Sequence, residues 1–204
     1  MNNEIQLSKR NTLSSTTIPQ TVFSHEGDNG VQIANQGTVN VFLTNNSGPV
    51  LNAASTLCTE YYNLFVVGNE AFNEPSFTIG KSCSLTIAEG VAPDISTRFA
   101  SLSTEAVTAI KSFPSLFASE NHHNGCTDAD HHAFYGRVVD VRIQENGIKI
   151  YFQKQSSFPQ QRLNELARSL ALHSASLLNE LDRTHWAIKR INLIEELRCA
   201  GINV

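Results

Sequence analysis

The chain has 204 residues, of which 41% are hydrophobic and eleven are phenylalanine, so it can bury a core and is not disordered throughout. Its formal net charge is −4 and its pI is near 6.0, which argues against nucleic acid as the main partner because the Lys/Arg excess that neutralises phosphate is missing. The four cysteines lie far apart with no C-x-x-C pair, which excludes a zinc ribbon and a thioredoxin-type motif and favours a reduced, cytoplasmic protein.

The first part of the chain predicts neither a signal peptide nor a membrane span. Residues 1–10 carry charges with no apolar stretch behind them, unlike a signal peptide. Residues 29–59 have no charge, but they are rich in Asn, Gln, Ser and Thr, whose burial in hydrocarbon would be costly. We expect residues 1–20 to form a flexible arm.

Two pairs of segments predict β-hairpins. Residues 31–33 and 39–41 alternate apolar and polar side chains on either side of Asn35-Gln36-Gly37, which supplies turn chemistry. Residues 137–143 and 148–152 flank Glu145-Asn146-Gly147, where the Asn-Gly pair tolerates positive φ. Residues 47–67 show a mixed pattern that separates neither helix from strand.

Helical spacing predicts one short helix in the middle of the chain and several at its end. Ser103 is a candidate N-cap for a helix that ends before Pro114. Further helices are expected after Pro159, from about Ser176, and from about Thr184 to Gly201.

The sequence therefore predicts an α+β fold, with antiparallel β-hairpins, a small barrel being one option, followed by a helical C-terminal unit. The expected division is a flexible N-terminal arm over 1–20, a mainly β domain with one short helix over 21–155, and a helical unit over 156–204.

A cluster of metal-ligand residue types lies between residues 121 and 132, where one loop contains four of the seven histidines. Imidazole, thiolate and carboxylate are the ligands that zinc prefers, so zinc is the one cofactor that this loop suggests. The other expectation is that the protein has no cofactor. Adjacent histidines would point in different directions, and a solvated polar loop is the alternative interpretation. The candidate ligands are His122, His123, Cys126, Asp128, His131 and His132.

Common catalytic signatures are missing from the sequence. Gly80-Lys81-Ser82 resembles the end of a phosphate-binding loop, but Pro75 stands where that motif needs its first glycine. No G-x-S-x-G, H-E-x-x-H or G-x-G-x-x-G motif occurs. No catalytic residue is assigned.

Two segments are candidate partner-binding sites. One candidate is the segment with Arg183, His185 and Trp186, because Trp and Arg dominate interface hot spots, and the alternative is a capped helix with Trp186 in the core. Val31, Gln32 and Ile33 begin a low-charge segment that resembles the apolar-Gln-apolar-small core of amyloid-type signalling motifs. An ordinary hairpin is the alternative there, with an edge that can pair with another chain. We expect a homo-oligomer.

Four segments together resemble uncharacterised bacterial proteins encoded with conflict or phage-defence systems, including accessory components of ABC-type three-part systems. These segments are Gly27-Asp-Asn-Gly-Val-Gln-Ile33, residues 113–120, residues 136–152 and residues 179–189. The resemblance implies an accessory or interaction role beside an NTPase or effector, and it assigns no catalytic residue.

The expected function is a non-enzymatic interaction or assembly module of a bacterial defence-type system, which binds partner proteins or assembles with itself. The alternative is a metal-dependent hydrolase or nuclease that uses the cluster from His122 to His132. Sensing of a small ligand stays open as a third class. A membrane partner is not expected.

Overall fold

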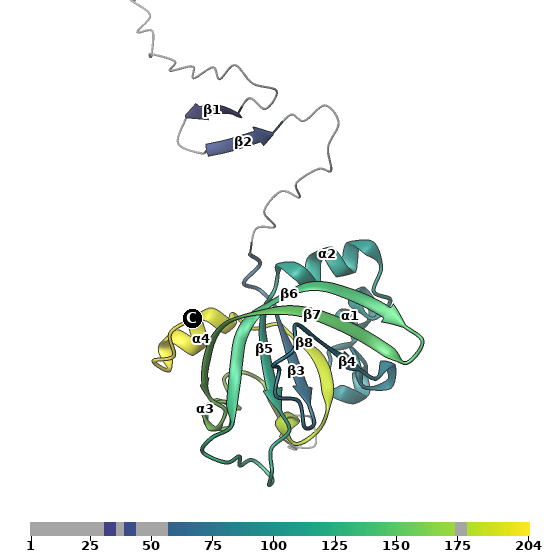
Figure 1. Cartoon of the computed structure of the whole chain (residues 1–204), viewed down its shortest axis with the longest axis vertical. Coiled ribbons are helices and arrows are strands. Elements are labelled where there is room, and N and C mark those ends of the chain that lie inside the picture. The colour runs from purple at the N-terminus through teal and green to yellow at the C-terminus, as the bar shows by residue number, and fades with distance from the viewer. Residues whose placement is uncertain (1–30, 36–38, 44–56, 174–178) are drawn as a thin grey trace, which may run out of the picture. The chain divides into compact units, whose positions relative to one another are not determined.

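The computed structural model describes residues 31–35, 39–43, 57–173 and 179–204 (Figure 1). The chain divides into two compact units, residues 1–53 and residues 54–204. The fold class is mixed α and β, as the sequence predicts. The expected arm over 1–20 lies outside the described residues.

The first unit contains one pair of strands. Strand β1 (Val31–Asn35) pairs antiparallel with β2 (Val39–Leu43), and Ile33 lies opposite Val41 in the register. This pairing confirms the hairpin predicted from the alternating pattern. The turn residues 36–38 lie outside the described part of the chain.

The second unit is built on a six-stranded sheet with the order β4-β7-β6-β5-β3-β8. Strands β3 and β5 are parallel, and every other neighbouring pair in this sheet is antiparallel. The strands are β3 (Tyr62–Val67), β4 (Ser76–Ile79), β5 (Pro114–Ser119), β6 (His132–Gln144), β7 (Gly147–Pro159) and β8 (His185–Lys189).

Four α-helices and three short 3-10 helices connect or flank these strands in the described residues. None of the described helices reaches the length and apolarity that a bilayer crossing requires. The helices are α1 (Pro93–Phe99), α2 (Thr104–Ser112), α3 (Gln161–Glu165), α4 (Leu193–Cys199), η1 (Lys81–Cys83), η2 (Ile87–Glu89) and η3 (Glu180–Asp182).

Two local predictions are confirmed in this unit. Strands β6 and β7 form the expected hairpin, with Gln144 opposite Gly147 at its turn. Helix α2 begins after Ser103, whose side-chain oxygen accepts a hydrogen bond of 3.2 Å from the backbone N–H of Ala106. Both features depend on residues close together in sequence, which is why the local pattern finds them.

The sheet is strongly curled and encloses an aromatic core. The ring centroids of Phe65 on β3 and Phe77 on β4 are 5.4 Å apart, although three strands separate β3 from β4 in the sheet order. Nevertheless, the sheet is open. In the described residues β4 does not pair with β8. The edge of β8 away from β3 carries only an isolated bridge between Ser84 and Trp186, with a hydrogen bond from the N–H of Leu85 to the carbonyl of Trp186. The fold is thus a mixed open sheet rather than a barrel or a series of hairpins.

The C-terminal region differs from the prediction. Residues 185–189, expected in a helix, form β8 and pair with β3, and only Leu193–Cys199 are helical in that stretch. All five β8 residues are buried, so the segment lacks the alternation by which a half-exposed strand is recognised.

The predicted boundary at residue 156 falls inside β7, and β8 belongs to the same sheet as β7, so residues 156–204 are not a separate helical unit. A helix does follow Pro159, at Gln161–Glu165, although Pro159 itself ends the strand β7. The expected start of a helix at about Ser176 falls within residues 174–178, which are outside the described residues.

Candidate metal centre

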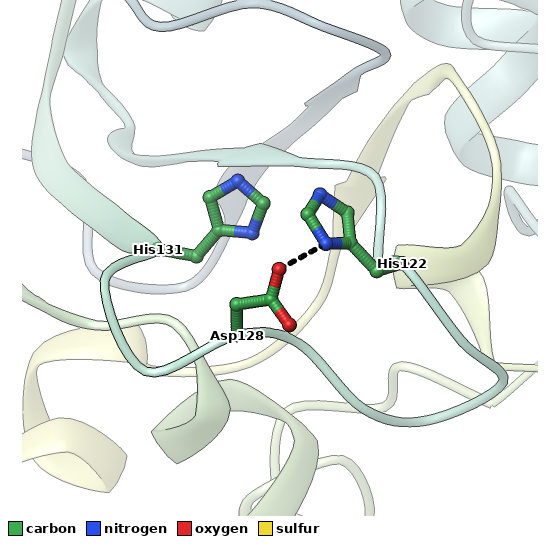
Figure 2. Close-up of side chains that lie close together, drawn as sticks. All are labelled: His122, Asp128 and His131. Carbon is green, nitrogen blue, oxygen red and sulfur yellow. Dashed lines mark ion pairs between the residues drawn. The ribbon is translucent and has the colours of Figure 1, made fainter.

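Three of the six candidate metal ligands converge on one point of the loop between β5 and β6. One ligand atom from each of His122, Asp128 and His131 lies within 4.8 Å of the others (Figure 2). The Nδ1 atom of His122 pairs with the Asp128 carboxylate, and the two imidazole rings meet edge to face with centroids 4.3 Å apart. Two imidazoles and a carboxylate therefore surround one small volume.

Two tight turns in the loop produce this convergence. His123 and Cys126 exchange backbone hydrogen bonds of 3.2 and 2.9 Å, and Gly125 within that turn has φ +70°, a conformation that glycine adopts without strain. In the second turn the N–H of His131 donates to the carbonyl of Asp128 at 3.1 Å. The first turn reverses the chain after His122, and the second places His131 beside Asp128.

Hydrogen bonds to the rest of the unit hold the loop in place. They run from Asn121 N to Leu181 O (2.8 Å), from Gly125 N to Asp182 Oδ1 (3.1 Å), from Thr127 N to Gln161 Oε1 (3.1 Å) and from Gln160 N to His131 O (2.8 Å). Because these bonds are spread along the loop, both turns are anchored to the start of α3 or to η3.

The other three candidate ligands, His123, Cys126 and His132, are not part of this cluster. His123 directly follows His122 and His132 directly follows His131, and neighbouring residues of an extended chain direct their side chains to opposite sides. The ring of His132 instead uses Nδ1 to donate to the carbonyl of Asp130 at 2.9 Å. One member of each histidine pair is thus available to the cluster.

The cluster lies at the surface, as the alternative interpretation of a solvated loop expects. The side chains of His122 and Asp128 retain 49% and 57% of their exposure. Two surface hollows in the described residues lie elsewhere, one beside α4 at Arg198 and Cys199 and one beside Gly136 and Arg137, and no loop residue lines either of them.

Two of the three residues proposed as a partner-binding site near Trp186 are buried. The side chains of His185 and Trp186 are fully buried, and Trp186 stacks on Phe65 with ring centroids 5.1 Å apart. Arg183 is partly exposed and forms an ion pair of 3.1 Å with Glu89. The core interpretation of Trp186 is therefore correct, but in a strand rather than a helix. The other proposed contact residues, Val31, Gln32 and Ile33, all belong to β1.

A buried charged cluster lies beside β8, and the sequence does not predict it. The Glu180 carboxylate accepts a hydrogen bond of 2.6 Å from Lys189 Nζ and lies 3.2 Å from His185 Nε2. His185 and Lys189 are four residues apart, a spacing that puts them on one face of a helix as well as of a strand, so the spacing gives no sign that Glu180 joins them.

This environment shifts the titration of the Glu180 carboxyl. Burial raises its pKa, but the hydrogen bond from His185 and the positive charge of Lys189 lower it by more, so the net pKa lies below the ordinary value. Gly90 is packed against the cluster in a left-handed conformation, and a Cβ atom there would lie 2.5 Å from Glu180 Oε1. The buried charges are paired, and their hydrogen bonds fix β8 against η3.

Comparison with known proteins gives no relative for this chain. No family model matches it, and neither the curated proteins nor the solved structures include a significant match.

Proposed function

We propose that this chain is a non-enzymatic assembly module whose β1–β2 hairpin pairs with the same hairpin of other copies. The observation that carries the proposal is that β1 and β2 form a two-stranded sheet in a unit separate from the six-stranded sheet.

A hairpin of this kind is incomplete by itself. An isolated two-stranded sheet is at best marginally stable in water, and three or more strands or a packed face are needed for independent stability. Among the described residues each of the two strands pairs only with the other, so each has one edge of unpaired backbone N–H and C=O groups.

The composition of the hairpin favours pairing with an identical strand. Residues 31–43 contain no charged side chain, whereas exposed edges are usually protected by charges or proline. In the register Val31 lies opposite Leu43 and Ile33 opposite Val41, which places β-branched and aliphatic residue types at paired positions. Such segments stack in register between copies because identical side chains then meet.

The resemblance to accessory proteins of bacterial defence systems supports the same role, with an NTPase or effector as a further protein partner. Since Trp186 and His185 are buried, this proposal assigns no partner contact to them. Assembly rests on the hairpin alone.

Sedimentation of the full chain tests this proposal. We expect the parent to form multimers at tens of micromolar, and the double variant Ile33→Lys/Val41→Lys to sediment near the monomer mass of 22.4 kDa, because repeated charges repel between copies. Val139→Lys, at a residue exposed in β6, is the matched control and should sediment like the parent. A monomeric parent, or equal multimers for parent and double variant, would contradict the proposal.

A metal-dependent hydrolase or nuclease is the second candidate, favoured by the convergence of His122, Asp128 and His131. Catalytic zinc sites keep three protein ligands and an open position for water, which is the number of ligands found here. Its test is hydrolysis of nucleic acids and simple phosphodiesters by the full chain with added Zn²⁺ or Mn²⁺. Activity lost in Asp128→Asn and kept in His132→Ala would support it, and no metal-dependent activity would remove it.

A further inference from the structure

We propose that the loop over residues 121–131 binds a single divalent transition-metal ion, Zn²⁺ by preference, through His122, Asp128 and His131. This site is independent of the assembly proposed for the hairpin. It stands on the geometry of the loop, and it requires no hydrolytic activity.

The donor set fits zinc better than magnesium or calcium. Imidazole nitrogen is a ligand for zinc and its neighbours in the transition series, whereas magnesium and calcium take oxygen ligands almost throughout. Ligand atoms of a tetrahedral zinc site lie about 3.4 Å apart, which follows from metal–ligand distances of about 2.1 Å. The three atoms here are within 4.8 Å of one another, and rotation of two half-exposed side chains closes the remaining gap.

The ring of His131 has one polar neighbour on the loop. Its Nδ1 atom lies 2.7 Å from the hydroxyl of Thr127, and Nδ1 is also the ring nitrogen that faces Asp128 in Figure 2. A metal bound through this nitrogen would take the place of the contact with Thr127.

The charges beside the loop favour a cation. Asp128 contributes one carboxylate to the cluster, and Asp182 accepts hydrogen bonds from Gly125 N at 3.1 Å and from the side chain of Asn121 at 2.6 Å. Two carboxylates therefore lie at this loop. Asp128 belongs to the loop itself, and Asp182 belongs to η3 and accepts hydrogen bonds from the loop. In the absence of a metal, Asp128 pairs with His122, and a bound ion would take the place of that direct contact.

The backbone anchors keep the cost of binding small. Because both turns are already hydrogen-bonded to α3 or η3, metal binding needs to order only the side chains of the ligands. A loop without such anchors would lose its backbone freedom at the same moment and bind more weakly.

Titration of the untagged full chain with Zn²⁺ alone, followed by calorimetry, tests the site. We expect one ion per chain, and a loss of affinity of at least about tenfold in each of His122→Ala, Asp128→Asn and His131→Ala, since each removes a ligand. His123→Ala and His132→Ala are the matched controls, because they change the neighbouring histidine and should bind within about threefold of the parent. Circular dichroism of each variant checks that it is folded.

A further measurement separates this set of ligands from others. Co²⁺ in place of zinc should give visible d–d bands of a nitrogen and oxygen site without the thiolate charge-transfer band that Cys126 would produce.

Zinc bound below one equivalent, or bound equally by the ligand variants and by the controls, would overturn the proposal. A thiolate band would overturn the ligand assignment. Neither result would affect the assembly proposal, which depends on Ile33 and Val41 and is read from the sedimentation of variants that leave the loop unchanged.

Discussion

Replacing Trp186 tests the account of the core. The side chain is fully buried and stacks on Phe65, its register partner across the β3–β8 pair. A buried aromatic side chain removes about 150–250 Å² from water, which at about 25 cal/mol per Å² sets an upper limit of about 4–6 kcal/mol. Measured costs of truncating buried Phe or Trp to Ala are about 3–5 kcal/mol, and we expect Trp186→Ala to lose that amount.

Thermal unfolding followed by circular dichroism measures this loss. In a unit of about 150 residues each kcal/mol corresponds to about 2–4 °C, so the melting temperature should fall by about 6–20 °C. Trp186→Phe is the matched control. It keeps a ring against Phe65 and removes a buried indole N–H that has no hydrogen-bond partner among the described residues, so its cost should stay below about 2 kcal/mol.

A second control, Val139→Ala, changes an exposed side chain on β6 and should alter stability by less than about 0.5 kcal/mol. The reasoning would be refuted if Trp186→Ala melted within about 2 °C of the parent, or if the phenylalanine variant lost as much stability as the alanine variant. Unchanged stability together with failed assembly would restore Trp186 as a partner contact.

Three other predictions concern stability, measured by urea unfolding. The folded pKa of Glu180 lies below its unfolded value, so the stability that this carboxylate contributes is present at neutral pH and is lost as the pH falls below about 4.3 towards the folded pKa. Glu180→Gln should therefore flatten the dependence of stability on acid pH. An unchanged pH profile in that variant would count against this role of Glu180. Gly136→Ala should cost about 1–3 kcal/mol or more, because the added Cβ would lie 2.1 Å from the carbonyl oxygen of Gln153 on the facing strand β7. A neutral effect would show that the backbone relaxes freely at the shift in register between Tyr135 and Gly136. Ser103→Ala should cost about 1 kcal/mol by removing the N-cap of α2, whereas Ser103→Gly should cost less, and the reverse order would argue against capping.

The sequence predicts those parts of the fold that local chemistry determines. The β6–β7 turn follows from Asn146-Gly147, and α2 follows from its Ser103 cap and its apolar spacing. Strands β3 and β8 could not be found in this way, because every residue in them is buried and no period-two pattern remains. The parallel pairing of β3 with β5 joins segments about 50 residues apart and leaves no local signal.

The candidate metal centre was predicted at the level of the loop but not of the ligands. Residue types alone placed six candidates together, and the expectation that adjacent histidines diverge is met, since one of each pair enters the cluster. Which one enters depends on the turn at Gly125 and on the turn that joins Asp128 to His131. The buried pair of Glu180 and Lys189 depends on tertiary packing and has no counterpart in the spacing of the sequence.

Hydrogen exchange at the backbone amides of residues 31–43, measured on the full chain over a range of concentrations, tests the proposed assembly most directly. A two-stranded hairpin that is completed by other copies should show protection that increases with protein concentration, since the edge N–H groups become bonded only on association. The Ile33→Lys/Val41→Lys variant should show no such increase. Exchange of these amides that is fast and independent of concentration in the parent would contradict the proposed assembly.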